Sequence, residues 1–340
     1  MLRRSRYLGF VITGAFIALL AWKIDLHELE VALVRANYLF IGPIVGCICA
    51  SYLLRTLRWK RILGPVRTLS FRTLVSVVFI GFMANNILPA RMGELVRAYA
   101  LGQKTGLSKS LGLATILVER LCDGLTLVLV LGVIALAMPL PSLVREVGIV
   151  ASLVFFAAGA GIVLVLAGGD RVRCLLVRAS QSLPERLSRP IERKADAFIA
   201  GLRTVQGGRQ LAVIAGWSIL VWSVEAATYL LVLRSFGPPR LHGPPVLAAL
   251  LMMAMVNLGT LIPSAPGYVG AYQFFGVLAL GAVGVPGGVA LAIAIVAHAA
   301  QWVTVTVIGL LCMARESMTV SVAPDGAMAD IPSGSAGRWR

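Results

Sequence analysis

The chain has 340 residues, of which 58% are hydrophobic and only 14% are charged. Because soluble domains carry about a quarter charged residues, this composition excludes an ordinary soluble enzyme, a disordered protein and a disulfide-stapled secreted module. The 31 Lys and Arg residues outnumber the 15 Asp and Glu residues, which gives a formal net charge of +16. In a membrane protein, an excess of basic residues indicates first which loops lie on the cytoplasmic side of the membrane. The excess is therefore no argument for nucleic-acid binding, and we expect no nucleic-acid partner.

Six apolar segments approach the ~20 residues that a helix needs to cross the hydrocarbon core of a bilayer. They are 7–22, 38–54, 111–138, 149–167, 211–233 and 288–313. The first follows the basic cluster Arg3-Arg4-Ser5-Arg6 and is predicted to be an uncleaved signal-anchor helix. The sequence therefore predicts an all-α integral membrane protein with about six transmembrane helices.

Two further apolar segments, 73–97 and 246–283, are interrupted by polar, Pro and Gly residues. The first break spans 85–94 and the second spans 261–270. Proline removes a helical hydrogen bond and glycine lets the chain turn back. Such backbone is tolerated at membrane depth only when it is buried in protein or lines a cavity. We therefore predict two re-entrant broken-helix hairpins.

The basic residues predict the topology. The 55–72 loop holds six basic residues and no acid, and the 168–210 stretch holds nine basic residues and four acids. If both broken segments are re-entrant, these loops share one side with the N-terminal cluster, and the positive-inside rule makes that side cytoplasmic. The expected location is a bacterial-type cytoplasmic membrane with both termini in the cytoplasm. The 168–210 stretch is expected to form one or two amphipathic helices on the anionic leaflet.

The two breaks resemble each other at an offset of 174 residues, about half of the chain, through shared Pro and Gly positions. The order of spans matches as well, so we predict one transmembrane domain over 1–315, with repeat one at 7–138, repeat two at 149–313, and a disordered cytoplasmic tail at 316–340. Three crossings per repeat require the second repeat to insert upside down. Inverted repeats with paired broken helices indicate a transporter with its site at the repeat interface.

The first break carries three charged residues at three-residue spacing, which are costly inside a membrane and hence functional candidates. They are Arg91, Glu94 and Arg97. If Gly93 opens a short helix, they share one face near a helix N-terminus, an arrangement suited to phosphate. Asn85 and Asn86 would add amide donors. The alternative is that the charges pair with each other and only hold the re-entrant segment in place.

The third span carries Glu119, Arg120 and Asp123, with the two acids one turn apart on the same helix face. Two such carboxylates repel each other, so either a cation lies between them or one is protonated. Arg91 or Arg97 is the expected partner, and Arg120 is able to reach toward the edge of the membrane.

Two more polar residues lie within later spans. Glu225 is interpreted either as a proton carrier or as a packing anchor, and His298 either as a proton relay or as a hydrogen-bonded interface residue. The second break has no charge and offers backbone amides, phenols and one amide for a polar headgroup. Its candidate residues are Pro266, Gly267, Tyr268, Gly270, Tyr272 and Gln273. The alternative is that Pro and Gly only make the turn of the hairpin.

Catalytic signatures are missing from the sequence: we find no nucleophile triad order, zinc-ligand cluster or nucleotide-binding loop. We therefore expect no cofactor, no metal and no enzymatic activity.

Three motifs in order resemble the lysylphosphatidylglycerol synthase transmembrane-region family, also called the flippase-like domain family. They are Asn86-x-x-Pro89-x-Arg91-x-Gly93-Glu94-x-x-Arg97, then Glu119-Arg120-x-x-Asp123, then Pro263-x-x-Pro266-Gly267-x-x-Gly270. The resemblance covers about 5–315 and implies an all-helical membrane domain. In fused members this domain is implicated in moving aminoacylated phosphatidylglycerol across the membrane.

Two departures qualify the resemblance. The chain ends at Arg340 without room for the aminoacyl-transferase domain of the fused members, so lipid lysylation is not expected. Many relatives have a second Gly and a Glu at the second break, where this chain has Tyr268 and Gln273. These exchanges bring any ion-coupling role of that Glu into question.

The resulting hypothesis is a lipid flippase that moves an anionic phospholipid or a polyprenyl-phosphate-linked headgroup, held in a cavity between the two hairpins. Arg91 and Arg97 would bind phosphate, and Glu94, Glu119 and Asp123 would fix the arginines or carry protons. One alternative is a non-transporting scaffold that recruits an envelope glycosyltransferase through the basic 168–210 surface. A membrane-embedded lipid-phosphate transferase is the third reading.

Overall fold

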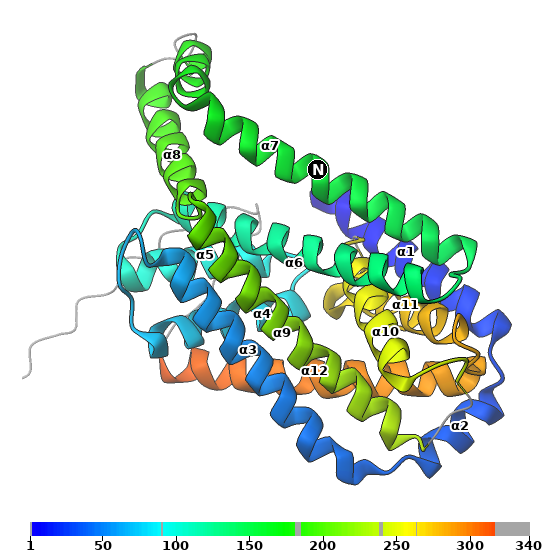
Figure 1. Ribbon diagram of the computed structural model, residues 1–340. Coiled ribbons are helices and arrows are strands. Elements are labelled where there is room, and N and C mark those ends of the chain that lie inside the picture. The colour runs from blue at the N-terminus through cyan, green and yellow to red at the C-terminus, as the bar shows by residue number, and fades with distance from the viewer. Residues whose placement is uncertain (1, 90, 181–184, 238–240, 263, 317–340) are drawn as a thin grey trace, which may run out of the picture.

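The computed structural model describes residues 2–89, 91–180, 185–237, 241–262 and 264–316 (Figure 1). Over these residues the chain forms twelve α-helices and two short 3-10 helices, and no strand. The predicted all-α fold is confirmed. Pro263 and nearly all of the expected tail, 317–340, lie outside the described residues.

Within the described part of the chain, five helices are long and apolar enough to cross a membrane. They are η1 with α3 (Tyr38–Leu63), α6 (Lys109–Ala137), the first part of α7 (Ser142–Gly169), α9 (Gly208–Ser235) and α12 (Gly287–Arg315). The sixth candidate is α1 (Leu2–Lys23) together with α2 (Leu26–Arg35), which are bent by 91° relative to each other. The predicted number of about six spans is therefore confirmed.

Both interrupted segments are pairs of short helices. The first consists of α4 (Phe71–Ile87) and α5 (Gly93–Thr105), which pack against each other. The second consists of α10 (Pro245–Gly259), η2 (Pro266–Tyr268) and α11 (Ala271–Gly281), with α10 packed on α11. With 17 and 15 residues, α4 and α10 fall short of the ~20 residues of a full span.

The two hairpins have their open ends at opposite ends of the bundle. At one end, Arg67 beside α4 donates to the carbonyl of Thr105 at the end of α5, at 2.6 Å. At the other end, the amide of His242 before α10 donates to the carbonyl of Val283 after α11, at 2.8 Å. The tips of the hairpins meet between these ends, as expected for inverted insertion. Between them, α10 is the most enclosed helix, and the side chains of 251–255 are fully buried.

The 168–210 stretch, predicted to form one or two amphipathic helices, contains one strongly amphipathic helix, α8 (Glu185–Arg203). α7 (Ser142–Ser180) is kinked at Gly169, where φ is 42°, and α8 has a strongly segregated polar face. The kinked end of α7 and most of α8 stand out from the bundle in Figure 1, and α8 also packs on α6. Its contact with a lipid leaflet stays a prediction.

The predicted start of the 55–72 loop is wrong. α3 (Ile41–Leu63) continues nine residues past the predicted end of the span at 54, and Arg55 and Arg58 lie inside the bundle with 5% and 0% of their surface exposed. They are stable there because carboxylates from other helices surround them, which the local sequence does not reveal.

Candidate functional site

The tips of the two hairpins meet through Arg91 and Tyr268. The guanidinium of Arg91 lies 5.5 Å from the centre of the Tyr268 ring and donates to the carbonyl of Thr260 at 3.0 Å. Among the described residues, Arg91 and Tyr268 are the two non-glycine residues with positive φ, at 55° and 61°. Such backbone costs about 1–3 kcal/mol and persists where surrounding structure enforces it, often at functional sites.

Gly93 opens α5, as predicted, and its position is sterically defined. Its amide donates to the side-chain oxygen of Asn85 at 2.8 Å, and a Cβ atom at Gly93 would collide with that oxygen and with the carbonyl of Gly81. The side-chain amide of Asn86 donates to the hydroxyl of Thr306 at 3.0 Å. Asn85 therefore accepts through its side-chain oxygen and Asn86 donates to protein groups, and a role of the two residues as amide donors to a ligand stays a prediction.

Arg91, Glu94 and Arg97 diverge in the structure. Arg91 and Glu94 form a loose pair at 4.0 Å, with 28% and 32% of their side chains exposed. Arg97 is buried, at 3% exposure, and its guanidinium lies 3.8 Å from the ring centre of Trp59. Arg97 is thus in the protein interior rather than at the membrane interface.

Glu119 accepts hydrogen bonds from two guanidinium groups and forms an ion pair with a third. Arg97 binds it through both terminal nitrogens, at 3.1 and 2.8 Å, and Arg120 binds it at 2.7 Å. Arg58 lies 3.6 Å away. The expectation that Arg97 pairs with an acid of the third span is confirmed.

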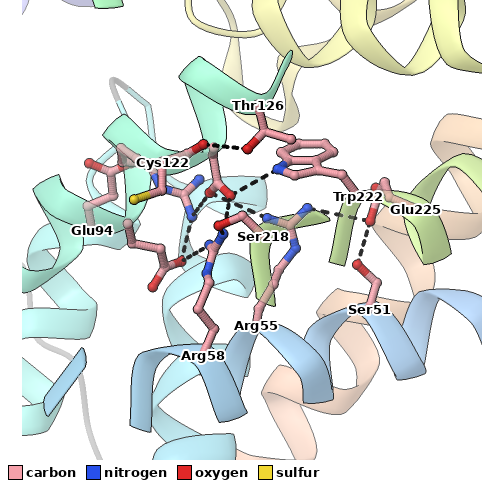
Figure 2. Close-up of polar contacts among 12 residues, drawn as sticks. Ser51, Arg55, Arg58, Glu94, Cys122, Thr126, Ser218, Trp222 and Glu225 are labelled. Atoms are coloured by element: carbon pink, nitrogen blue, oxygen red, sulfur yellow. Dashed lines mark hydrogen bonds and ion pairs between the residues drawn. The ribbon is translucent and has the colours of Figure 1, made fainter. Parts of the chain in front are cut away.

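Asp123 is held in the same network, shown in Figure 2. Arg58 from α3 binds it at 2.7 Å, and the indole of Trp222 from α9 donates to it at 3.1 Å. Arg120 and Arg55 lie at 3.1 and 3.6 Å. Two cations, Arg58 and Arg120, therefore stand between the two acids of α6, which removes the repulsion that their spacing implies.

Glu225 joins the network from α9. It accepts from the hydroxyl of Ser51 at 2.6 Å and pairs with Arg55 at 3.5 Å, both from α3 (Figure 2). Since Glu225 is 4% exposed, this carboxylate binds α9 to α3 within the interior. We name the whole set the arginine network. It consists of Arg55, Arg58, Arg97 and Arg120 with Glu119, Asp123 and Glu225.

Hydrogen bonds around His298 order the second break. The amide of Gly270 donates to the side-chain oxygen of Gln273 at 2.9 Å, so the side-chain nitrogen of Gln273 faces Nδ1 of His298, also at 2.9 Å. Nε2 of His298 lies 2.8 Å from the carbonyl of Gly267. The network thus assigns a neutral His298 with its proton on Nε2. The Tyr272 ring stacks on it at 4.3 Å.

One cavity lies where the two hairpins meet. Its volume is about 80 Å³, below the ~300–1,000 Å³ that is usual for ligand sites. The candidate residues from the sequence that line it are Asn85, Asn86, Arg91, Glu94, Arg120, Tyr268, Tyr272 and His298. Further lining residues not singled out from sequence are Tyr52, Phe82, Val256, Asn257, Thr260, Gln301 and Trp302.

The remaining candidates lie behind this lining. Arg97, Glu119, Asp123 and Glu225 belong to the arginine network, and Gly267 and Gln273 hold His298. Pro266 opens η2, and Gly270, at a φ of 84°, precedes α11.

Sequence reasoning missed Arg55 and Arg58 because they were assigned to a loop. One signal was available: Ser51, Arg55 and Arg58 recur at helical spacing, four and three residues apart, in continuation of an apolar helix. The cavity now combines two guanidinium groups, one exposed carboxylate and three phenol rings, which suits an anionic group with a polar substituent.

Comparisons with known proteins agree with this architecture. The sequence model described as "Lysylphosphatidylglycerol synthase TM region" matches residues 6–309. The chain is 28% identical over 337 residues to a protein of Haloferax volcanii named "Glycosyltransferase AglD", covering 88% of this chain and 52% of that protein. It therefore spans about half the length of that relative.

A second relative matches over nearly its full length. It is a "UPF0104 membrane protein" of Methanothermobacter thermautotrophicus, 23% identical over 329 residues, with 91% of this chain and 92% of the relative covered. Among solved structures, no significant match was found.

Proposed function

The chain belongs to the lysylphosphatidylglycerol synthase transmembrane-region family, and from this premise we propose that it is a lipid translocase of the flippase type. It moves a lipid with an anionic phosphate headgroup, either a phospholipid or a polyprenyl-phosphate-linked sugar, across the cytoplasmic membrane. It carries out no covalent chemistry on that lipid, and both termini lie in the cytoplasm.

The observation that carries this proposal is the cavity shared by two hairpins that open toward opposite ends of the bundle. Arg91 of one hairpin contacts Thr260 and Tyr268 of the other, so one bound headgroup would touch both. A site reached from both halves is what alternating access requires. The acyl or polyprenyl chains would stay in lipid, because the cavity, at about 80 Å³, is too small to hold them.

The structure supports different roles for the arginines than the sequence suggested. Arg91 and Arg120 line the cavity and have partly exposed side chains, so they are the proposed phosphate ligands. Arg97 uses both terminal nitrogens on Glu119 and is assigned to positioning that carboxylate. Glu94 would compete with the phosphate for Arg91 and so assist release.

We propose a glycosyltransferase as the partner of the exposed α7–α8 region. The relative AglD is named a glycosyltransferase and is about twice as long as the matched region. α8 has a strongly segregated polar face and stands out from the bundle (Figure 1), which suits a docking surface. The second candidate function is therefore an accessory protein that recruits such an enzyme without transporting lipid.

Reconstitution in proteoliposomes tests the translocase. Labelled phosphatidylglycerol or a polyprenyl-phosphate-linked sugar is placed in one leaflet, and its appearance in the other is followed by headgroup accessibility. Arg91→Ala is expected to reduce the rate at least about tenfold, because a charged phosphate contact is worth ~1.5–3 kcal/mol. The matched control is Arg35→Ala, which removes an exposed arginine at the end of α2, outside the cavity.

Two outcomes decide between the candidate functions. Normal translocation by Arg91→Ala would contradict the site. If the wild-type protein does not translocate lipid, yet substitutions on the exposed face of α8 abolish the recovery of a glycosyltransferase with it, the accessory function replaces the translocase.

A further inference from the structure

The arginine network has more positive than negative groups. It contains four guanidinium groups, from Arg55, Arg58, Arg97 and Arg120. Against them stand three carboxylates, from Glu119, Asp123 and Glu225. Each carboxylate lies within 3.6 Å of at least one guanidinium group and is counted with its formal negative charge. One positive charge is therefore left over in the interior of the bundle.

The rest of the cavity adds no net charge. Arg91 and Glu94 cancel each other, and the hydrogen bonds of His298 with Gln273 and Gly267 assign a neutral ring. The other ionisable lining groups are the phenols of Tyr52, Tyr268 and Tyr272, which are neutral near pH 7. The cavity and the network together carry one net positive charge.

Arg120 brings this charge to the cavity. Its side chain is 24% exposed and lines the cavity, whereas those of Arg55, Arg58 and Arg97 are 6%, 0% and 3% exposed. Both ion pairs of Arg120 use Nη2, and its Nε is buried without a hydrogen-bond partner. An uncompensated charge is costly inside a membrane. A ligand with one negative charge removes that cost, and a neutral or doubly charged ligand does not.

We propose that the cavity selects lipids whose phosphate is a diester with a single negative charge, over phosphomonoesters and zwitterionic headgroups. A phosphodiester carries one charge, whereas a phosphomonoester carries about 1.5 to 2 negative charges at pH 7. This inference rests on the proposed function, since it defines the substrate class of the same cavity. Phosphatidylglycerol and polyprenyl-phosphate-linked sugars share the required chemistry.

The selection has a consequence for a carrier lipid. A polyprenyl phosphate with an attached sugar is a diester, and the carrier left after transfer of that sugar is a monoester. The cavity therefore takes the loaded carrier and rejects the spent one. The reaction that consumes the transported lipid would be a glycosyl transfer, whose lipid product no longer fits.

Binding of defined lipids to the purified full-length protein tests the charge rule. Native mass spectrometry compares phosphatidic acid with its methyl ester, phosphatidylmethanol, which has the same acyl chains and one charge less. The wild-type protein is expected to bind the methyl ester at least about tenfold more tightly, since one uncompensated charge at low dielectric constant outweighs that factor. Two further binding comparisons identify the source of the diester. One compares polyprenyl phosphate with a polyprenyl-phosphate-linked sugar, and the other compares phosphatidylglycerol with phosphatidylethanolamine.

Glu94→Gln is the informative variant, because it raises the net charge from one to two and removes only a loose, partly exposed pair. It is expected to erase or invert the preference for the methyl ester. Glu146→Gln, at an exposed position of α7, removes the same charge elsewhere and should leave the preference unchanged.

Four outcomes separate the two proposals. Equal binding of both esters by the wild type, or an unchanged ratio in Glu94→Gln, overturns the charge rule. Absence of lipid binding overturns it as well. If the ratio behaves as expected but proteoliposomes show no translocation, the charge rule stands and the translocase function fails.

Discussion

Charged side chains inside this bundle are stable only as a set. Arg58 is fully buried and contacts both acids of α6, and Arg97 forms two parallel hydrogen bonds with Glu119. Such pairs contribute little net stability compared with apolar packing, but the loss of one partner leaves a buried charge uncompensated. The network therefore makes the interior of the protein sensitive to single substitutions.

Glu119→Gln tests this sensitivity. The substitution preserves the size of the side chain but leaves Arg97, Arg58 and Arg120 without a shared counter-charge, so we expect a loss of about 3–5 kcal/mol in stability. Thermal unfolding in detergent measures it as a lower midpoint. Glu94→Gln, which affects a partly exposed pair at 4.0 Å, should cost less than about 1 kcal/mol. Equal shifts in the two variants would speak against a structural network.

Tyr268 combines a side-chain contact with backbone strain. Tyr268→Ala and Tyr268→Gly both remove the ring that faces Arg91, but only Gly adopts a φ of 61° without strain. We expect the Gly variant to be more stable than the Ala variant by about 1 kcal/mol. Unfolding midpoints of the pair measure the difference directly, and a more stable Ala variant would show that the backbone is not strained there.

At the residue scale, the sequence predicted that either a cation separates Glu119 and Asp123 or one of them is protonated, since their spacing on one helix face follows from helical geometry alone. It did not identify Arg58, because the two partners lie 65 residues apart in the chain and meet only through packing. Arg91 or Arg97 was the expected partner, and Arg97 is the one that binds Glu119.

The broken helices are the elements that create the site. Pro89 and Gly93 at the first break, and Pro266 and Gly270 at the second, predicted where the helices stop and restart. The end of α3 was harder to predict. Its last turns are rich in basic residues and resemble a loop in composition, and only the acids of α6 and α9 make burial there favourable.

Gly93 is the structural joint of the first hairpin. Gly93→Ala is expected to destabilise the protein by about 1–3 kcal/mol, because the new methyl group collides with Gly81 and Asn85 where α4 and α5 cross. Gly132→Ala in α6 is the matched control. Apart from the nearby backbone of α6 itself, no atom lies within 4 Å of the position of its new methyl group, so this variant should be neutral or slightly stabilising. The unfolding midpoints of both variants measure the difference in stability. Equal midpoints would mean that the hairpin tolerates separation of α4 and α5.

On the scale of the whole molecule, loops that are distant in sequence gather at two ends. At one end, the side chain of Gln210 in the first turn of α9 donates to the carbonyl of Arg61, and Lys104 contacts Glu316. At the opposite end, Asn37 donates to the carbonyl of Ser235 at 2.7 Å. The distribution of basic residues predicted this grouping, because charge asymmetry between loops records the orientation of every span at once.

Orientation in the membrane is the prediction that belongs to this scale. Cys174, exposed in the kinked end of α7, is a native reporter for the basic end, which should be cytoplasmic. Glu30→Cys in α2 and Ser142→Cys at the start of α7, each combined with Cys174→Ser, report on the other end. A membrane-impermeant maleimide applied to intact cells should label Glu30→Cys and Ser142→Cys, and should label Cys174 only after permeabilisation.

The Cys174→Ser protein without a new cysteine gives the background from the four partly buried cysteines. Labelling of Cys174 in intact cells would invert the topology, and labelling of Glu30→Cys and Ser142→Cys from opposite sides would contradict α3 and α6 as full spans, because these helices separate the two positions.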